Sequence, residues 1–349
     1  MRLSQEQIEA LKKQNPGAFA GFIGDSAKGI SGFGMDAASI ATGGAFLASE
    51  LEKINPKILE PLTSVTYQED MPFNEGGGWV DFTSNFFAEY ATTAQDEDSI
   101  IGTNTNDIPV SQANINKEVS KVWTFAEALK YGYIDMQKSN QVGCDIKKLM
   151  DTGLRLNYNK MLDKNTYKGI TKLGTYGLVN NSNVSSGLVA NNAAGTSKLW
   201  KDKTGQEILD DVNTLAQAIF AACEYDQSGI PNHMLIPVEA MSYLQRPMTI
   251  AGCNSILQYI KENYFGLEYG VDLVIKGRRW CKGAGASSTD RMVMYRYDEN
   301  RIVTDITVPL MPVQTSWVPT QLSYLTPYVS QVGQVKFLYL QTIRYADGI

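Results

Sequence analysis

The stretch Trp79-Val-Asp-Phe-Thr-Ser-Asn-Phe-Phe-Ala-Glu-Tyr90 alternates apolar and polar residues. So does Ile108-Pro-Val-Ser-Gln-Ala-Asn-Ile-Asn-Lys-Glu-Val-Ser-Lys-Val-Trp-Thr-Phe125. A period of two is typical of half-buried antiparallel strands, and a polar link, Thr92–Asp107, joins the two runs. The pattern predicts a long β-hairpin whose apolar residues share one face: Val80, Phe82, Phe86, Ile115 and Val119.

This hairpin is long for the size of the chain. A strand of about 17 residues extends about 55 Å, whereas a compact domain of 349 residues has a radius of gyration of only about 20 Å. A long hairpin is marginal in isolation. We therefore expect its apolar face to rest on a neighbouring subunit; the alternative is that its strands break and fold back onto their own domain.

The composition argues against several classes of protein. The net charge of −6 argues against avid binding to DNA or to anionic membranes, although it permits a protein that merely surrounds DNA. No apolar run is long enough for a membrane helix, and the N-terminus lacks a signal-peptide core. The cysteines show no paired spacing, which favours reduced thiols in a cytosolic setting; they are Cys144, Cys223, Cys253 and Cys281.

Few residues suggest catalysis. The chain has one histidine, His233, and the common triads and dyads depend on that residue type; we interpret it as a structural residue at the start of a buried strand. Gly283-Ala-Gly285 lacks the third glycine and the helix of a dinucleotide loop, and Asp96-Glu97-Asp98 lacks EF-hand spacing. We expect no enzymatic activity, no cofactor and no metal; the alternative is a soluble α/β enzyme that uses carboxylates within 204–295.

One long helix and one second lobe follow the hairpin. Gln141–Leu162 carries an apolar stripe at helical spacing, whose core-facing residues are expected to be Ile146, Leu149, Met150 and Leu154. Helices and strands alternate over about 204–295, which is typical of a small α/β lobe. It opens with a capping box at Thr204-Gly-Gln-Glu207. Its basic cluster is a candidate contact with another subunit or with DNA, against the plainer interpretation of a surface turn: Lys276, Arg278 and Arg279.

Strand-like runs close the chain at 292–297, 301–308, 315–325 and 334–346. The last run is rich in β-branched and aromatic residues, which suit a pleated, half-buried surface. We expect these runs to form the platform on which the other parts are mounted, in an α+β fold. Residues 1–58, with their many glycines and weak periodicity, indicate an arm that lies along another surface.

Several motifs resemble, in their order, those of the major capsid proteins of tailed bacteriophages and prophages. The resemblance covers about residues 30–349. Its motifs are Gly32-Phe-Gly-Met-Asp-Ala-Ala, Phe46-Leu-Ala-Ser-Glu-Leu-Glu-Lys-Ile-Asn-Pro-Lys, Tyr131-Gly-Tyr, Tyr176-Gly-Leu-Val-Asn, Thr204-Gly-Gln-Glu-Ile-Leu-Asp-Asp-Val-Asn, Gly283-Ala-Gly-Ala-Ser-Ser-Thr-Asp-Arg-Met-Val-Met-Tyr-Arg-Tyr-Asp and Arg344-Tyr-Ala-Asp-Gly-Ile.

The resemblance implies the HK97-type capsid fold and gives each predicted part a place in it. The parts are an N-terminal arm (1–58), an E-loop hairpin (59–126), a P-domain that begins with a spine helix (127–203, helix 141–162), an inserted A-domain (204–295) and closing P-domain strands (296–349).

The same resemblance implies self-assembly into hexamers and pentamers of an icosahedral head that encloses double-stranded DNA. The expected partners are further copies of the chain, a separate scaffold protein, a portal protein and decoration proteins, with weak non-specific contact to DNA and none to a membrane. The expected location is the virion, after assembly in the cytoplasm of a bacterial host. An encapsulin-like nanocompartment shell with the same fold is the alternative.

Overall fold

The computed structural model describes residues 61, 63–93, 108–143, 145–248, 255–298 and 304–349. The chain divides into two units, Met1–Thr63 and Ser64–Ile349. Every helix and strand among the described residues lies in the second unit. The arm expected at 1–58 and the acidic run Asp96–Asp98 lie outside the described residues.

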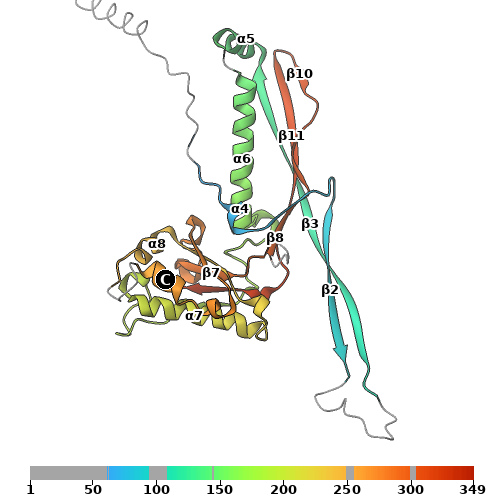
Figure 1. Ribbon diagram of the computed structural model, residues 1–349. Coiled ribbons are helices and arrows are strands. Elements are labelled where there is room, and N and C mark those ends of the chain that lie inside the picture. The colour runs from blue at the N-terminus through green and yellow to red at the C-terminus, as the bar shows by residue number, and fades with distance from the viewer. Residues whose placement is uncertain (1–60, 62, 94–107, 144, 249–254, 299–303) are drawn as a thin grey trace, which may run out of the picture. The chain divides into compact units, whose positions relative to one another are not determined.

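Three sheets organise Ser64–Ile349 (Figure 1). The smallest joins β1 (Phe73–Glu75), β8 (Thr304–Val308) and β12 (Val335–Phe337). An antiparallel sheet has the order β10 (Val318–Thr320), β11 (Ser323–Gly333), β3 (Ser111–Gly132) and β2 (Phe82–Thr92), with β9 (Leu310–Gln314) also paired to β11. A mixed sheet has the order β4 (Ser186–Leu188), β13 (Ile343–Asp347), β7 (Arg291–Tyr295), β5 (His233–Ile236) and β6 (Val274–Gly277).

Strand β3 belongs to two structural parts at once. Its first half, Ser111–Lys121, pairs with β2 and forms the predicted hairpin. Its second half, Val122–Gly132, pairs with β11. The expected boundary between hairpin and P-domain at residue 126 therefore falls inside one continuous strand. A hairpin built this way is anchored by the sheet that its own strand continues into.

The expected helix 141–162 is two helices in the structure. Helix α5 (Tyr133–Val142) ends at Gly143, whose φ of +75° suits a glycine C-cap. Helix α6 (Ile146–Lys168) then begins at Asp145, whose carboxylate accepts hydrogen bonds from the backbone N–H groups of Lys147 and Lys148. The apolar spacing continues across the break, so periodicity alone does not reveal it.

Only part of the expected helix core is buried. Leu154 is buried, and Ile146 and Met150 are half-buried. Leu149 is 42% exposed, so its assignment to the core is wrong for the single chain. The buried stripe runs from Leu154 toward the end of α6, where Tyr158 and Leu162 pack against the rest of the protein. The first two turns of α6 line an open groove instead.

The second lobe begins with the predicted capping box, but its sheet includes strands from outside the predicted range 204–295. Helix α7 (Gly205–Ala222) opens with the expected capping box of Thr204 and Glu207. Helices α8 (Val238–Leu244) and α9 (Ile256–Glu262) follow. The last predicted run, 334–346, divides between two sheets, since β12 pairs with β8 while β13 pairs with β4 and β7 of the lobe. The lobe therefore also uses residues on both sides of 204–295.

The mixed sheet of the lobe is covered on both faces. One face packs against α7, α8 and α9 through Met234, Ile236, Met292 and Met294. The other carries Leu235, Val293, Tyr295 and Tyr345 against Tyr158, Leu162 and Tyr167 of α6. Strands buried on both faces are apolar at successive positions, which explains why β5 and β7 show no alternation.

Short elements complete the chain: helix α4 (Tyr67–Asp70) and the 3-10 helices η2 (Thr171–Leu173), η3 (Trp200–Asp202), η4 (Gln227–Gly229), η5 (Phe265–Tyr269), η6 (Arg279–Cys281), η7 (Ala286–Ser288) and η8 (Leu340–Thr342). Where α6 ends, the chain passes close to itself at Gly177. A Cβ there would lie 2.3 Å from the carbonyl carbon of Tyr167, which only glycine avoids.

The C-terminal strand is held by a buried ion pair. Arg291 of β7 donates from Nε and Nη2 to the carboxylate of Asp347 in β13, at 2.7 and 2.9 Å. The same carboxylate accepts a hydrogen bond from the backbone N–H of Ala286, in the loop that precedes β7. The guanidinium also lies 4.4 Å from the ring centroid of Tyr345. The loop 283–290 thus braces the C-terminal strand and has no nucleotide-binding helix after it.

Candidate assembly surfaces

The hairpin presents one apolar face to solvent. The β2–β3 register pairs Phe82 with Lys121, Ser84 with Val119, Phe86 with Lys117, Ala88 with Ile115 and Tyr90 with Ala113. Side chains of directly opposed residues lie on the same side of an antiparallel pair. The apolar members of this face are exposed in the single chain: Phe82 by 61%, Phe86 by 69%, Tyr90 by 85%, Ile115 by 75% and Val119 by 52%.

Two residues of the predicted hairpin lie elsewhere. Val80 precedes β2, is half-buried, and exchanges two hydrogen bonds with the side-chain amide of Gln331, so its place on the exposed face is wrong. Phe87, which interrupts the alternation, lies on the opposite face of β2 and is half-buried. The face that we call the hairpin face is therefore Phe82, Phe86, Tyr90, Ile115 and Val119.

Lysines lie among these apolar side chains. Lys117 and Lys121 are on the same side of the hairpin, and the Lys117 ammonium lies 5.8 Å from the ring centroid of Phe86. An exposed apolar face rimmed by polar groups is typical of a protein interaction site. The hairpin face has the composition of such a site.

The predicted basic cluster is neutralised inside the chain. Arg278 donates to Asp70 at 2.5 and 2.7 Å and to Glu69 at 2.6 Å, and the Lys276 ammonium lies 3.3 Å from Asp70. Burial lowers the pKa of Arg278, but its hydrogen bonds to Asp70 and Glu69 outweigh burial and raise that pKa above its ordinary value. The expectation that the cluster faces DNA or another subunit is therefore wrong for these two residues.

Arg279 is also paired, although more exposed. It donates to Asp163 at 3.1 Å, and the indole of Trp280 donates to the same carboxylate at 2.8 Å. Asp163 lies on α6 and also accepts from the backbone N–H groups of Thr66 and Tyr67. The basic cluster thus ties the lobe loop to α4 and α6. The acidic partners on these helices lie more than a hundred residues away in the sequence.

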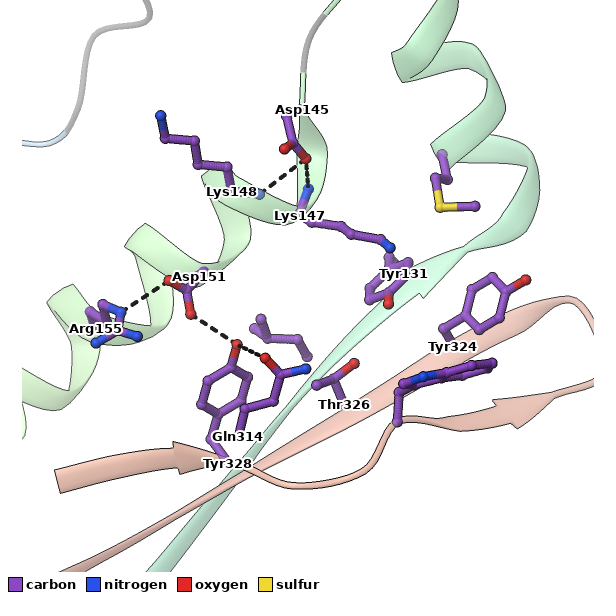
Figure 2. Close-up of a pocket in the computed structure, with 13 residues that line it drawn as sticks. Tyr131, Asp145, Lys147, Lys148, Asp151, Arg155, Gln314, Tyr324, Thr326 and Tyr328 are labelled. Atoms are coloured by element: carbon purple, nitrogen blue, oxygen red, sulfur yellow. Dashed lines mark hydrogen bonds and ion pairs between the residues drawn. The ribbon is translucent and has the colours of Figure 1, made fainter. Parts of the chain in front are cut away.

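A groove separates the start of α6 from the antiparallel sheet (Figure 2). Its volume is about 610 Å³. Aromatic side chains form much of the wall: the Tyr131 and Tyr324 ring centroids are 5.5 Å apart, and the Trp317 ring meets Tyr324 edge-on at 5.4 Å. Figure 2 shows Lys147 extending toward Tyr131, 5.3 Å from its ring centroid.

Most acidic groups of the groove are already engaged. Asp151 accepts from Arg155 Nε at 3.0 Å and from the Tyr328 hydroxyl at 2.9 Å, and the hydrogen bond from Arg155 is the main cause that lowers the pKa of Asp151. Asp145 caps α6, as described above. Within the part of the chain that the structure describes, neither Lys147 nor Lys148 has an ion-pair partner, and the groove is lined by three basic and two acidic side chains.

Sequence reasoning missed this groove. Its residues come from β3, α5, α6 and its N-cap Asp145, from Gln314 at the end of β9, from Trp317 in the link between β9 and β10, and from β11. The local signal is weak because each strand contributes only a few side chains. The alternation of Tyr324, Thr326 and Tyr328 in β11 is the one pattern that could have indicated the aromatic wall.

His233 lies buried in β5, and its ring centroid is 5.7 Å from that of Tyr295 and 4.7 Å from that of Tyr297. Burial, with help from the nearby charge of Lys276, lowers its pKa to about 4. Cys223 and Cys281 are free thiols, and burial raises the pKa of both. In the described parts of the chain, no group of three or more His, Cys, Asp or Glu side chains is placed to hold a metal ion.

The hairpin, the long helix α6 and the three sheets can now be compared with known proteins. The family model for the major capsid protein matches residues 96–349. The chain belongs to the major capsid protein family. The match covers the hairpin's second strand β3, the long helices α6 and α7, the lobe and all closing strands. It favours neither of the alternatives, the nanocompartment shell and the soluble enzyme.

Solved structures share the fold of this major capsid protein. The capsid of Myoviridae phage XM1 is 14% identical with a TM-score of 0.70, over 86% of this chain and 98% of that chain. The capsid of a native GTA particle is 10% identical with a TM-score of 0.59, over 90% and 99%. A chain of Microbacterium phage Oxtober96 is 14% identical with a TM-score of 0.57, over 89% and 99%. These likenesses establish the HK97-type fold.

No curated protein matches the sequence of this chain. Among the helices that the structure describes, none is long and apolar enough to cross a membrane. As a member of a capsid family, the protein is a structural component that assembles with its own copies into a shell.

Proposed function

We propose that this major capsid protein forms the hexamers and pentamers of an icosahedral phage head around double-stranded DNA. The observation that carries the proposal is the hairpin face. Its apolar side chains are solvent-exposed in the single chain, although they are as large as typical core residues. Burying each on a neighbour is worth about 1.5–3 kcal/mol before the costs of ordering.

In the proposed shell, three regions of the chain each make one contact with neighbouring subunits. The hairpin face rests on an adjacent subunit. The arm, 1–58, crosses to another neighbour, and the lobe, 204–295, lies near the axis of the capsomer. Individually weak contacts add up, because each subunit makes several at once.

Contact with the genome is proposed to be weak and non-specific. The chain carries a net charge of −6, and its lobe cluster Lys276–Arg279 is engaged by acids of the same chain. Few free cations mean little counterion release on a DNA backbone. A shell of this composition encloses DNA without holding it tightly.

The proposed partners and place of assembly rest on the resemblance to tailed-phage capsid proteins. The protein assembles in the cytoplasm of a bacterial host with a separate scaffold protein and a portal protein, and decoration proteins attach to the finished head. The mature location is the virion. No catalytic step belongs to this function.

Electron microscopy of the expressed chain, alone and with the scaffold protein encoded beside its gene, tests the proposal. Closed icosahedral shells or separate hexamers and pentamers are expected. A stable monomer under all conditions would contradict it. Shells that contain a host-encoded enzyme instead of DNA would show that the protein forms a nanocompartment and not a phage head.

A further inference from the structure

We propose that the lobe binds an extended segment of a separate protein, which carries a carboxylate and adds a strand to the β4 edge of the lobe sheet. The site is a groove between β4 and α7 with a volume of about 320 Å³, which we call the β4 groove. It lies among residues 185–190, Thr214, Leu215 and Ala218 of α7, and Arg344 and Ala346 of β13. Such binding requires neither the shell nor its DNA.

Strand β4 has free backbone groups along one side. The N–H of Tyr345 in β13 donates to the carbonyl oxygen of Ser185 at 3.0 Å. Alternate residues of a strand point their backbone groups to opposite sides, so Ser186 and Leu188 direct their N–H and C=O groups away from β13. Among the described residues, no strand pairs with that side of β4. An open edge of this kind is a template for a further strand.

The α7 side of this edge leaves room for a side chain. Gly187 pairs with Ala346, which belongs to the core between the sheet and α7, so Gly187 also faces α7. A Cβ on Gly187 would meet no atom within 4 Å. Leu215 and Ala218 of α7 line the same space. A strand laid beside β4 can therefore direct a small apolar side chain between β4 and α7.

Arg344 gives the β4 groove its charge. It is half-buried on β13, two residues before Ala346 and so on the same side of the sheet. Within the described residues, its guanidinium has no hydrogen-bond or ion-pair partner. Asp211, which also lines the groove, is engaged by Lys203 and Trp200. Because a guanidinium binds a carboxylate through two parallel hydrogen bonds, we expect the occupant to carry a carboxylate.

The open edge, the space over Gly187 and the charge of Arg344 together select one kind of occupant. Recognition by strand addition takes affinity from main-chain hydrogen bonds and specificity from alternate side chains. Ser186 and Leu188 supply the main-chain groups, and the groove receives one apolar and one acidic side chain. The hairpin face already offers a surface to further copies of this chain, so we assign the β4 groove to a different protein.

Disulfide capture tests the groove in the full-length chain. Thr214→Cys places a thiol on an exposed position of the α7 wall. The probes are short peptides of valine and threonine with one cysteine and one aspartate at varied spacing, and matched sets carry asparagine or lysine in place of the aspartate. All compete in a thiol–disulfide exchange buffer, and mass spectrometry counts the captured peptides.

We expect one aspartate spacing to be captured at least about tenfold more than its asparagine and lysine matches, because it meets Arg344. N-methylation of that peptide's backbone should abolish the preference, since it removes the N–H donors of the added strand. Gln217→Cys is exposed on α7 outside the groove. This matched control should show no preference, and the natural cysteines are present in both variants.

Three further variants separate charge from space. Arg344→Gln in the Thr214→Cys chain should capture aspartate and asparagine probes equally. Gly187→Leu fills the groove and should lower the capture of every probe, whereas Gly187→Ala should retain it, because nothing lies within 4 Å of the added Cβ. Hydrogen exchange should slow over residues 185–190 when the aspartate probe is bound.

The opposite results overturn the proposal. Equal capture of all probes by the Thr214→Cys chain, or a preference for aspartate that survives Arg344→Gln, would show that the β4 groove does not select an acidic strand. Slow exchange over residues 185–190 in shells of the unaltered chain alone would show that a second copy fills the groove, against a separate protein. Circular dichroism checks that each variant is folded, and the Gly187 pair tests the groove without altering Arg344.

Discussion

Three arginines of this protein hold distant segments of the same chain together. Arg278 joins the lobe to α4 through Asp70, Arg279 joins it to α6 through Asp163, and Arg291 joins β7 to the C-terminal strand through Asp347. Removing one partner of a buried pair is costly because it leaves an uncompensated charge. Arg278 and Arg291 are therefore committed to the fold, because their side chains and their partner carboxylates are largely buried, whereas the Arg279 side chain is 55% exposed.

His233 makes stability depend on pH. Its folded pKa of about 4 is below the ordinary value of about 6.5, so the unfolded chain binds a proton that the folded chain does not between these values. Stability is therefore complete above about pH 6.5 and is lost as pH falls toward 4. From about pH 7.5 to about pH 5 we expect a loss of about 2 kcal/mol from this group.

Urea unfolding at the two pH values measures this loss. His233→Gln keeps a polar side chain without a titrating ring, so subtracting its pH dependence isolates the contribution of His233 from that of the carboxylates. Equal pH dependence in both proteins would show that the imidazole titrates normally in the folded chain.

Among the elements, β3 determines what the hairpin can do. One strand of 22 residues supplies the hairpin with its first half and the platform sheet with its second. Hydrogen bonds therefore run without interruption from the platform into the hairpin. The hairpin needs no packing on its own domain to keep its direction, which leaves its apolar face free for a neighbour.

Phe86→Ser tests the hairpin face at this scale. Phe86 is exposed in the single chain, so the free energy of unfolding should change by no more than about 0.5 kcal/mol. Assembly should weaken by about 1.5–3 kcal/mol for each phenyl ring that no longer packs on a neighbouring subunit. This raises the required protein concentration at least tenfold, by the rule that about 1.4 kcal/mol is one decade.

Light scattering with electron microscopy measures the assembly of this variant. Asn85→Ser, on the opposite face of the same strand, is the matched control and should assemble normally. Normal assembly of Phe86→Ser would show that the hairpin face stays open to solvent in the shell.

The whole molecule exposes apolar and charged surfaces that no other part of the described chain covers. In the single chain the hairpin face is exposed and the α6 groove is open. A partner that binds only the folded chain stabilises the folded state by mass action. The free energy of unfolding of this protein should therefore depend on its assembly as well as on contacts within the chain.

Thermal unfolding at several protein concentrations tests this expectation. The unfolding temperature should rise with concentration across the range where capsomers form, because assembly binds only the folded chain. Phe86→Ser should show a smaller rise than the unaltered chain. A midpoint independent of concentration, in a sample that electron microscopy shows to be assembled, would contradict the coupling.

The sequence by itself determined the local elements of this capsid protein and its family. Alternation at Phe82–Tyr90 and Ala113–Val119 predicted the hairpin, and the capping box at Thr204 predicted the start of α7, because both signals depend on neighbours within a few residues. Tertiary structure alone decided the rest. It divided 141–162 at Gly143, shared β3 between two partners, moved the last strand into the lobe, paired Arg278 with Asp70 and assembled the α6 groove. Each depends on a partner far away in the chain, and no local period records which distant strand or carboxylate will be there.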